Sequence, residues 1–373
     1  MLMQITNRTM KILIVSSYDS TGNSARAEGE WLIGLKKAGV EVEVMMRGDA
    51  PYANIFRAHG IPVYDHLVRR KISLTTMRLL RRLVKERAYD ILHLFNTKAI
   101  TNAVIGTIGQ RVVLMSYRGY TGNLYWYKPT SYLNHFNPRV RRIVCVSDAV
   151  RRQVQRQLPR NKQKAVTLYK GHNIKWYEEI IPLSRDALGW PALAFVVGIV
   201  ANARPMKGIR YFIDAARYLA PYTAIHFVMI GENMDNPGYM QRIARSPLGR
   251  NFHVMGFRND SLQIMAATNL AVLSSVRGEG LSKTIIEAMG LGLPVVATDV
   301  GGNNELVDPG HTGQLVPPRN AQALARAIHH YYINPLLRKQ HGQNGRERIR
   351  RHFPLEQSVS QALALYKEMA RLK

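Results

Sequence analysis

Short apolar runs alternate with amphipathic stretches along most of the chain. Each run is bounded by polar or turn-forming residues and is far shorter than a membrane span, which is typical of a buried strand in a parallel sheet. The stretches between the runs repeat apolar residues at helical spacing. In the first half this pattern predicts strands at residues 11–17, 40–46, 90–95, 111–117, 142–146 and 165–169, and helices that include residues 73–87 and 148–158.

The second half of the chain repeats the same alternation. Strands are predicted at residues 195–201, 225–230, 253–256, 270–273 and 312–316, and helices at residues 208–219, 262–268, 284–289 and from 321 onward. A proline-bounded segment, residues 182–191, is the predicted linker between the halves. Strand–helix repeats on both sides of a linker indicate an α/β fold with two doubly wound domains.

Composition agrees with this division. The chain has 373 residues, more than one hydrophobic core usually serves, and 46% of them are hydrophobic. The single cysteine, Cys145, excludes an internal disulfide framework and lies inside an apolar run, which favours a buried strand residue over a nucleophile.

The net charge of the chain is large and unevenly distributed. The formal net charge is +27, and residues 1–165 hold 28 Lys and Arg against 10 Asp and Glu, which is +18 of that total. Such an excess implies a polyanionic partner, either nucleic acid or an anionic membrane surface. The alternative is a solvated basic surface without a specific partner.

Candidate chemistry gathers in residues 274–290, which read as the end of a strand, a glycine-bearing turn and a helix. Backbone N–H groups at such a helix start suit an anion. Glu279 in the turn and Glu287 in the helix are acceptors for hydroxyl groups, so the stretch predicts a phosphate flanked by polyols, as in a nucleotide sugar. Alternatively, Glu279 is a solvated turn residue and Glu287 closes a capping box with Thr284.

The letters E-G-L-S-K-T-I-I-E-A-M-G in this stretch resemble the E-x7-E signature of the family 4 retaining glycosyltransferases, also called glycosyl transferases group 1. The later G-G-N-N-E-L-V, residues 301–307, is similar to the family's G-G-x-x-E-x-V element. The resemblance implies the GT-B fold, with two Rossmann-like domains facing a cleft. We therefore expect an acceptor-side domain at residues 1–180, joined by a C-terminal helix at 355–373 that crosses back, and a nucleotide-sugar domain at 181–354.

The resemblance also assigns roles to residues. Glu279 contacts the donor sugar and Glu287 the ribose, while Lys207, in a K-G element, binds the diphosphate. Arg204 replaces an arginine that the family has upstream, where this chain has Asn202. Fixed cations stabilise the charge that develops on a leaving diphosphate, although a pair of solvated loop cations is the alternative. The remaining donor-binding candidates are Gly280, Leu281, Ser282, Gly256, Phe257, Gly22 and Arg118.

Four of these candidates depend on their position after a predicted strand. Gly22 lies in a predicted loop, residues 19–25, that opens the first long helix. Arg118 stands near the place where the family commonly has a histidine, and His172 is a second substitute, although a structural role is expected for it. Gly256 and Phe257 offer backbone groups to a base, with a plain turn as the alternative. The chain has no Asp-x-Asp pair, so neither a metal nor another cofactor is predicted.

With this resemblance, the sequence predicts a glycosyltransferase that moves a sugar from a nucleotide-sugar donor to a lipid-linked or envelope glycan, as in cell-surface polysaccharide or lipopolysaccharide assembly. The resemblance implies that the transfer retains the anomeric configuration. The amphipathic residues 73–87 carry Arg78, Arg81, Arg82 and Lys85, which favours a peripheral position on the anionic inner face of the cytoplasmic membrane. The alternatives are a nucleotide-sugar epimerase and a basic nucleic-acid-binding protein, but no specific nucleic acid is expected as partner.

Overall fold

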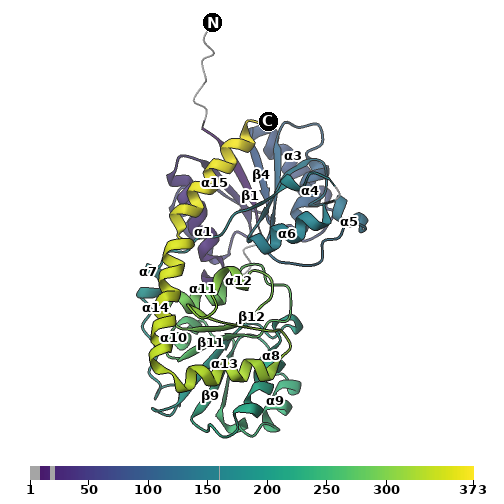
Figure 1. Ribbon diagram of the computed structural model, residues 1–373. Helices are drawn as coiled ribbons and strands as arrows, with labels where there is room; N and C mark the ends of the chain where they lie inside the picture. Colours follow the sequence, from purple (N-terminus) through teal and green to yellow (C-terminus); the bar gives the residue numbers. More distant parts are fainter. Residues whose placement is uncertain (1–8, 17–21, 159) are drawn as a thin grey trace. The chain divides into compact units, whose positions relative to one another are not determined.

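The apolar runs of the sequence form two parallel sheets, each covered by helices, in the computed structural model of the chain (Figure 1). The structure describes residues 9–16, 22–158 and 160–373. The chain divides into two compact units, residues 1–171 with 355–373 and residues 172–354. The predicted α/β fold class is therefore confirmed, and each unit is a doubly wound sheet of its own.

The sheet of the first unit has the strand order β3-β2-β1-β4-β5-β6-β7, and the strands are parallel. The central strand β1 pairs with β2 on one side and β4 on the other, so the order of the strands reverses between β1 and β4. The strands are β1 (Lys11–Val15), β2 (Glu41–Met46), β3 (Val63–Asp65), β4 (Ile91–Leu94), β5 (Val113–Arg118), β6 (Val140–Cys145) and β7 (Ala165–Thr167).

Helices of the first unit begin where the sequence supplies caps. Side chains of Ser73, Asn96 and Ser147 accept the hydrogen bonds that start α3, α4 and α6. The C-terminal helix α15 lies along α1, where the Trp31 indole donates to the backbone carbonyl of Ser358 at 3.3 Å. The helices are α1 (Gly22–Lys37), α2 (Pro51–Ala58), α3 (Leu74–Arg87), α4 (Thr97–Gly106), α5 (Pro129–Tyr132), α6 (Asp148–Gln157), the 3-10 helix η1 (Lys162–Lys164) and α15 (Leu355–Ala370).

The sheet of the second unit has the order β10-β9-β8-β11-β12-β13, again with parallel strands. The strands are β8 (Phe195–Val200), β9 (Ile225–Ile230), β10 (Phe252–Gly256), β11 (Leu270–Leu273), β12 (Val295–Thr298) and β13 (Gly313–Val316). The helices are α7 (Lys175–Glu178), η2 (Pro205–Lys207), α8 (Ile209–Ala215), η3 (Ala216–Leu219), α9 (Pro237–Ala244), η4 (Gly249–Asn251), α10 (Ser261–Ala266), α11 (Lys283–Gly290), α12 (Asn303–Leu306), α13 (Ala321–Ile333) and α14 (Pro335–His352).

Several predicted boundaries shift. Helix α1 begins at Gly22, inside the predicted loop 19–25, while residues 17–21 lie outside the described residues. The helix predicted at residues 208–219 is divided into α8 and the 3-10 turn η3. The short strands β3 and β12 were not predicted, because β3 has only three residues and β12 follows a helix after a tight glycine–proline turn.

The division between the units falls after residue 171, and residues 172–180 belong with the second unit. The backbone N–H of His172 donates to the carbonyl of Phe353 at 2.8 Å. The ring of Tyr177 packs so closely on Gly290 of α11 that an added Cβ would lie 2.4 Å from it. These contacts tie residues 172–180 to the second unit, and the predicted linker, residues 182–191, lies within that unit.

A buried carboxylate, Glu43 on β2, ties the edge of the first unit's sheet together. It accepts from Arg87 Nη2 at 2.6 Å and from Tyr64 Oη at 2.8 Å, and Tyr89 Oη donates to it as well. The Lys11 ammonium lies 3.1 Å away. Burial by itself would raise the pKa of Glu43, but these donors outweigh it and lower the pKa to about 2.

We expect acid to remove the stabilisation that the ionised Glu43 carboxylate gives to the first unit. The folded pKa of about 2 lies below the value of about 4.3 in an unfolded chain, so Glu43 stabilises the first unit above that value. The stability is lost as the pH falls from about 4.3 towards about 2. Glu43→Gln should lower the free energy of unfolding at pH 7 by about 2–4 kcal/mol, because it leaves partners of a buried charge unpaired. Urea unfolding followed by circular dichroism measures this.

Glu347→Gln is the matched control. Glu347 pairs with Arg350 and Arg351 on the exposed face of α14, where water screens the charges, so no change is expected. Equal destabilisation by the two substitutions would contradict the account of Glu43.

Candidate functional site

Most of the predicted site residues follow strands β8 and β11 of the second unit. These two strands are neighbours, and the strand order of the sheet reverses between them. In open α/β sheets, ligands bind outside the carboxyl ends of the strands at such a switch point. Lys207 follows β8 and Glu279 follows β11, so the topology brings the two predicted residues to the same place.

An ion pair joins Lys207 and Glu279 at this switch point. The Lys207 ammonium lies 2.6 Å from Oε1 of Glu279, and the two side chains are 22% and 7% exposed. The hydroxyl of Ser275, which is fully buried, donates to the same carboxylate oxygen. The alternative of a solvated turn residue is therefore wrong for Glu279, because its carboxylate is buried and bonded.

The backbone around Lys207 is fixed by the end of β11. The Ser274 hydroxyl donates to the carbonyls of Lys207 and Gly208 at 3.1 and 3.2 Å. Gly208 has φ +62°, and a Cβ there would lie 2.1 Å from the Ser274 carbonyl oxygen. Only glycine fits this approach, so the K-G element holds the lysine against the strand end.

Helix α11 follows Glu279 and carries the second glutamate. Ser282, not Thr284, caps this helix, since its hydroxyl accepts from the Ile285 N–H. The Thr284 hydroxyl donates instead to the carbonyl of Val200 at 3.1 Å. Glu287 pairs with Lys283 at 2.8 Å and its side chain is 10% exposed. The alternative of a capping box between Thr284 and Glu287 is therefore wrong.

The turn between Glu279 and α11 places the other predicted residues of this stretch beside the ion pair. Gly280 is buried and Leu281 is half-buried, and Ser282 is buried as the cap of α11. Their part in donor binding stays a prediction.

Other predicted residues lie at the same edge of the second sheet. Gly256 is the last residue of β10 and has φ +62°, and the ring of Phe257 beside it is half exposed. Arg204 is exposed on the segment before η2. The Asn202 amide donates to Glu232 at 2.9 Å, so this residue is engaged where the family has an arginine. The binding roles of Arg204, Gly256 and Phe257 stay predictions.

In the first unit, Arg118 is the last residue of β5 and is buried. Its Nη2 donates to the carbonyl of Gly122, and its guanidinium lies 3.9 Å from the centre of the Tyr120 ring. Burial lowers the pKa of Arg118. These contacts hold the segment that follows β5, so Arg118 has a structural role. Its part in donor binding stays a prediction. The same is true of Gly22 at the start of α1.

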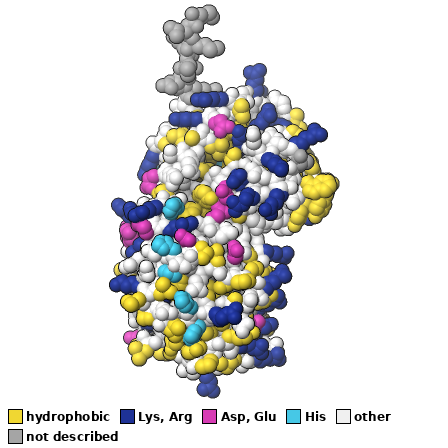
Figure 2. All heavy atoms as spheres, viewed as in Figure 1, with side chains coloured by type: hydrophobic (Ala, Val, Ile, Leu, Met, Phe, Trp, Pro, Cys, Tyr) yellow, Lys and Arg dark blue, Asp and Glu magenta, His cyan; other side chains and the backbone are white. Residues whose placement is uncertain are grey.

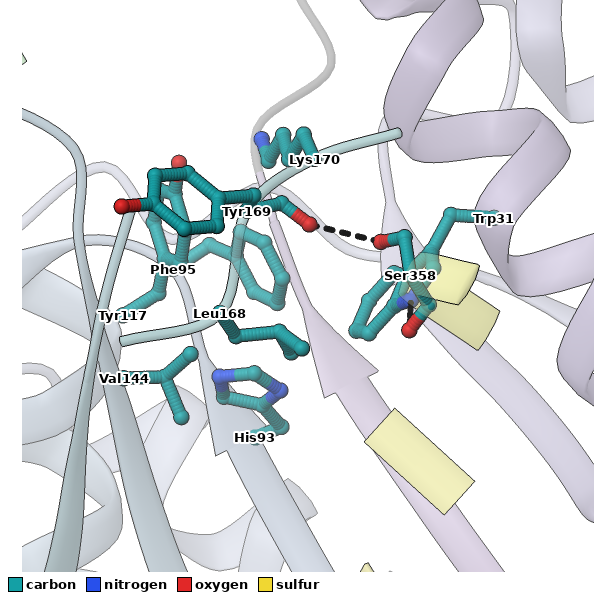
Figure 3. Close-up of a pocket in the computed structure, with 9 residues that line it drawn as sticks. All are labelled: Trp31, His93, Phe95, Tyr117, Val144, Leu168, Tyr169, Lys170 and Ser358. Carbon is teal, nitrogen blue, oxygen red and sulfur yellow. Dashed lines mark hydrogen bonds between the residues drawn. The ribbon is translucent and has the colours of Figure 1, made fainter. Parts of the chain in front are cut away.

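Figure 3 shows a small cavity at the carboxyl edge of the first sheet. The Lys170 ammonium above it pairs with Glu28 and lies 4.4 Å from the centre of the Tyr117 ring, which stacks on Phe95. Burial alone would lower the pKa of Lys170, but Glu28 and Tyr117 raise it above its ordinary value, so the lysine stays charged. The cavity is lined by Trp31, His93, Phe95, Tyr117, Val144, Leu168, Tyr169, Lys170 and Ser358.

Several residues of this arrangement were not predicted from the sequence. Lys283 carried a usable signal, since it stands four residues before Glu287 on a helix. Ser275 and Lys170 carried none beyond their position after a strand. Gly301 was noted only as part of a motif, yet its backbone has φ +58° and an added Cβ would lie 2.0 Å from the carbonyl oxygen of Glu279.

Two other residues considered in the sequence, His172 and Cys145, have contacts typical of structural residues. His172 Nδ1 lies 2.6 Å from the hydroxyl of Tyr177, and the two rings stack, as expected for a structural histidine. Cys145 is buried on β6, and burial raises the pKa of its thiol to about 12, so it is no thiolate nucleophile. Within residues 9–16, 22–158 and 160–373, no three His, Cys, Asp or Glu side chains gather as metal ligands.

Two family models match the chain. Residues 194–334 match the family described as glycosyl transferases group 1, and residues 30–176 match the family described as glycosyltransferase family 4. An *Escherichia coli* protein named UDP-Gal:alpha-D-GlcNAc-diphosphoundecaprenol alpha-1,3-galactosyltransferase is 24% identical over 84% of each chain. The lipopolysaccharide core biosynthesis mannosyltransferase LpsB of *Rhizobium meliloti* (strain 1021) is 27% identical over 50% of this chain and 56% of its own length.

Solved structures show the same fold. The crystal structure of *Anabaena* Alr3699/HepE in complex with UDP-glucose superposes with a TM-score of 0.77 at 23% identity, covering 95% of this chain and 99% of that one. With the family matches, this confirms the fold and the family that the E-x7-E stretch predicts.

The contact between Gly301 and Glu279 yields a prediction. Gly301→Ala should destabilise the second unit by about 2–4 kcal/mol, since the new methyl group meets a backbone oxygen and the residue keeps a left-handed conformation. Gly310→Ala, at φ +76° with open space around the Cβ, should cost only the conformational part, about 1 kcal/mol. Thermal unfolding of the two variants measures the difference, and similar losses would show that Gly301 does not abut Glu279.

Proposed function

Because the chain belongs to the group 1 glycosyltransferases of the GT-B fold, we propose that its second unit binds a nucleotide-sugar donor at the Lys207–Glu279 pair. The observation that carries the proposal is the position of this pair at the strand-order reversal between β8 and β11. A cation and a carboxylate in contact there match the two parts of such a donor, a diphosphate and a sugar with hydroxyl groups.

Each side chain has a task in this proposal. Lys207 binds the diphosphate, with Arg204 as the second cation. Glu279 accepts hydrogen bonds from sugar hydroxyls, and Glu287 accepts them from the ribose. When the bond between the anomeric carbon and the diphosphate breaks, the fixed ammonium of Lys207 stabilises the charge that develops on the leaving oxygen.

We further propose that transfer retains the anomeric configuration. The carboxylate of Glu279 is already engaged by Lys207 and Ser275, which suits a hydrogen-bond acceptor better than a nucleophile. The acceptor hydroxyl then attacks the face that the diphosphate leaves, and its proton passes to the leaving phosphate oxygen. One bond forms and one breaks at the anomeric carbon, without a covalent intermediate on the protein.

The relatives support a choice of donor and acceptor. The *Anabaena* structure contains UDP-glucose, and the *E. coli* relative is named for a UDP-galactose donor. We therefore propose a UDP-sugar as donor. The same *E. coli* relative is named for a diphosphoundecaprenol-linked acceptor, and the *Rhizobium* relative for lipopolysaccharide core biosynthesis. A lipid-linked or envelope glycan is the acceptor that these names favour.

A lipid-linked acceptor places the enzyme at a membrane, and the first unit has charges that suit it. Arg78, Arg81, Arg82 and Lys85 are exposed on α3, while Met77, Leu80, Leu83 and Val84 of the same helix are buried. Each cation near an anionic surface contributes on the order of 1 kcal/mol. In the described part of the chain, no helix is long and apolar enough to cross a bilayer. We propose peripheral attachment at the inner face of the cytoplasmic membrane.

The function is tested by offering the protein a panel of nucleotide sugars with and without a membrane extract, and by measuring release of nucleoside diphosphate. Lys207→Ala should weaken binding of UDP in calorimetry by about 1.5–3 kcal/mol, the scale of a hydrogen bond to a charged group. Lys339→Ala, which removes an exposed lysine of α14, is the matched control and should bind UDP as the wild type does.

Two results would contradict the proposal. Unchanged UDP affinity in a folded Lys207→Ala protein would remove this lysine from the site. Turnover of a nucleotide sugar at the same rate with and without every acceptor tested, with the sugar still attached to the nucleotide, would favour an epimerase.

A further inference from the structure

The segment between β5 and β6 in the first unit exposes a group of large apolar side chains. Trp126 and Tyr127 are 58% and 60% exposed, and Tyr132 and Leu133 are 38% and 48% exposed. Figure 2 shows hydrophobic atoms gathered at the edge of this unit, where Figure 1 places α5. Single exposed apolar residues are common, but a group of them marks an interaction surface. We call these four residues the aromatic cluster.

Hydrogen bonds to helix α6 and buried side chains hold the segment that carries the aromatic cluster. The N–H groups of Gly122 and Trp126 donate to the side-chain oxygens of Gln153 and Gln157 on α6, at 3.0 and 3.3 Å. Within the same segment Leu124, Ser131, His135 and Phe136 are buried. The apolar side chains therefore project from a fixed framework. They are not the by-product of an unpacked loop.

The charged residues that flank the aromatic cluster along the chain are basic. No Asp or Glu occurs between Asp90 and Asp148 in the sequence. The ammonium of Lys128 lies 4.7 Å from the centre of the Tyr125 ring, inside the segment. Arg156 is exposed on α6, the helix that holds the segment. A partner that contacts the aromatic cluster thus meets apolar surface and positive charge together.

We propose that the aromatic cluster inserts into the boundary between headgroups and acyl chains of an anionic phospholipid bilayer. Tryptophan and tyrosine favour this boundary, since each presents an apolar ring and a polar group that stays hydrated. Lys128 and Arg156 then face lipid phosphates. The inference rests on the membrane location proposed above and adds to it a specific, shallow mode of attachment.

Insertion differs physically from the attraction that α3 provides. The exposed cations of α3 act through screened charge, so their contribution falls steeply as salt is added. Burial of apolar side chains does not depend on salt in this way. At low salt the protein should bind anionic vesicles through the cations of α3 and through the aromatic cluster together. Once the protein is bound, the aromatic cluster should stay in the lipid.

The fluorescence of Trp126 is an intrinsic probe for this test. Of its four tryptophans, Trp31, Trp176 and Trp190 are buried, and Trp126 alone is exposed. The full-length protein is mixed at low salt with phosphatidylcholine vesicles that contain phosphatidylglycerol. Tryptophan emission should shift to shorter wavelength, and phosphatidylcholine with brominated acyl chains should quench it. Trp126→Tyr should remove the shift and the quenching, because the remaining tryptophans lie inside the protein.

Variants measure how much the aromatic cluster contributes. Trp126→Ser combined with Leu133→Ser should weaken vesicle binding about tenfold or more, the scale of burying large apolar side chains. Tyr218→Ser, which changes an exposed tyrosine of η3 in the second unit, is the matched control and should bind vesicles as the wild type does. UDP binding should be unchanged in all of these variants, which separates this inference from the donor site.

Three results would overturn the inference. Vesicle-bound protein whose Trp126 emission neither shifts nor is quenched would show that the aromatic cluster stays out of the lipid. No binding to anionic vesicles at low salt would remove both the insertion and the membrane location, while UDP binding would still test the donor site. Loss of self-association in the serine variants, with vesicle binding intact, would assign the cluster to a contact between copies of the chain.

Discussion

The ion pair between Lys207 and Glu279 is the interaction on which the site depends. A pair of charges taken out of water rarely gains stability, because the lost hydration offsets the attraction. Here the sheet nevertheless holds the pair in place, with Ser275 bonded to the carboxylate and Gly301 against its backbone. A charged group that is partly shielded from water and held in one orientation suits a catalytic role better than a role in stabilising the fold. Such a group needs no reorganisation when charge develops on a substrate.

The rest of each unit positions such groups through the order of its strands. In the second unit the reversal between β8 and β11 sets Lys207 beside Glu279. In the first unit Lys170, which follows the edge strand β7, pairs with Glu28 on helix α1. The two units differ in charge and surface, since the first carries most of the net positive charge and the aromatic cluster. This asymmetry fits a donor on one unit and a lipid-borne acceptor met by the other.

Much of this could be predicted from the sequence, because apolar runs bounded by polar turns define strands and a specific motif located Glu279. The missing parts depend on residues far apart in the chain. The hydrogen bond from the Ser274 hydroxyl to the Lys207 carbonyl joins two loops, and no local sequence pattern predicts it. The alternative of a Thr284–Glu287 capping box has the right spacing in the sequence, but the Thr284 hydroxyl donates to the carbonyl of Val200 and Ser282 caps α11. Arg118 was read by position alone, and its burial became visible only with the segment that folds over it.

Calorimetry of donor binding tests the central claim, that Lys207 holds the diphosphate and Glu279 the sugar, most directly. The wild type, Glu279→Gln and Lys207→Ala are titrated with UDP and with the UDP-sugar that the donor panel selects. The account predicts that Glu279→Gln binds UDP as tightly as the wild type does but loses the additional affinity for the sugar, whereas Lys207→Ala loses affinity for both. Equal weakening of UDP and UDP-sugar binding by Glu279→Gln, in a folded protein, would contradict it.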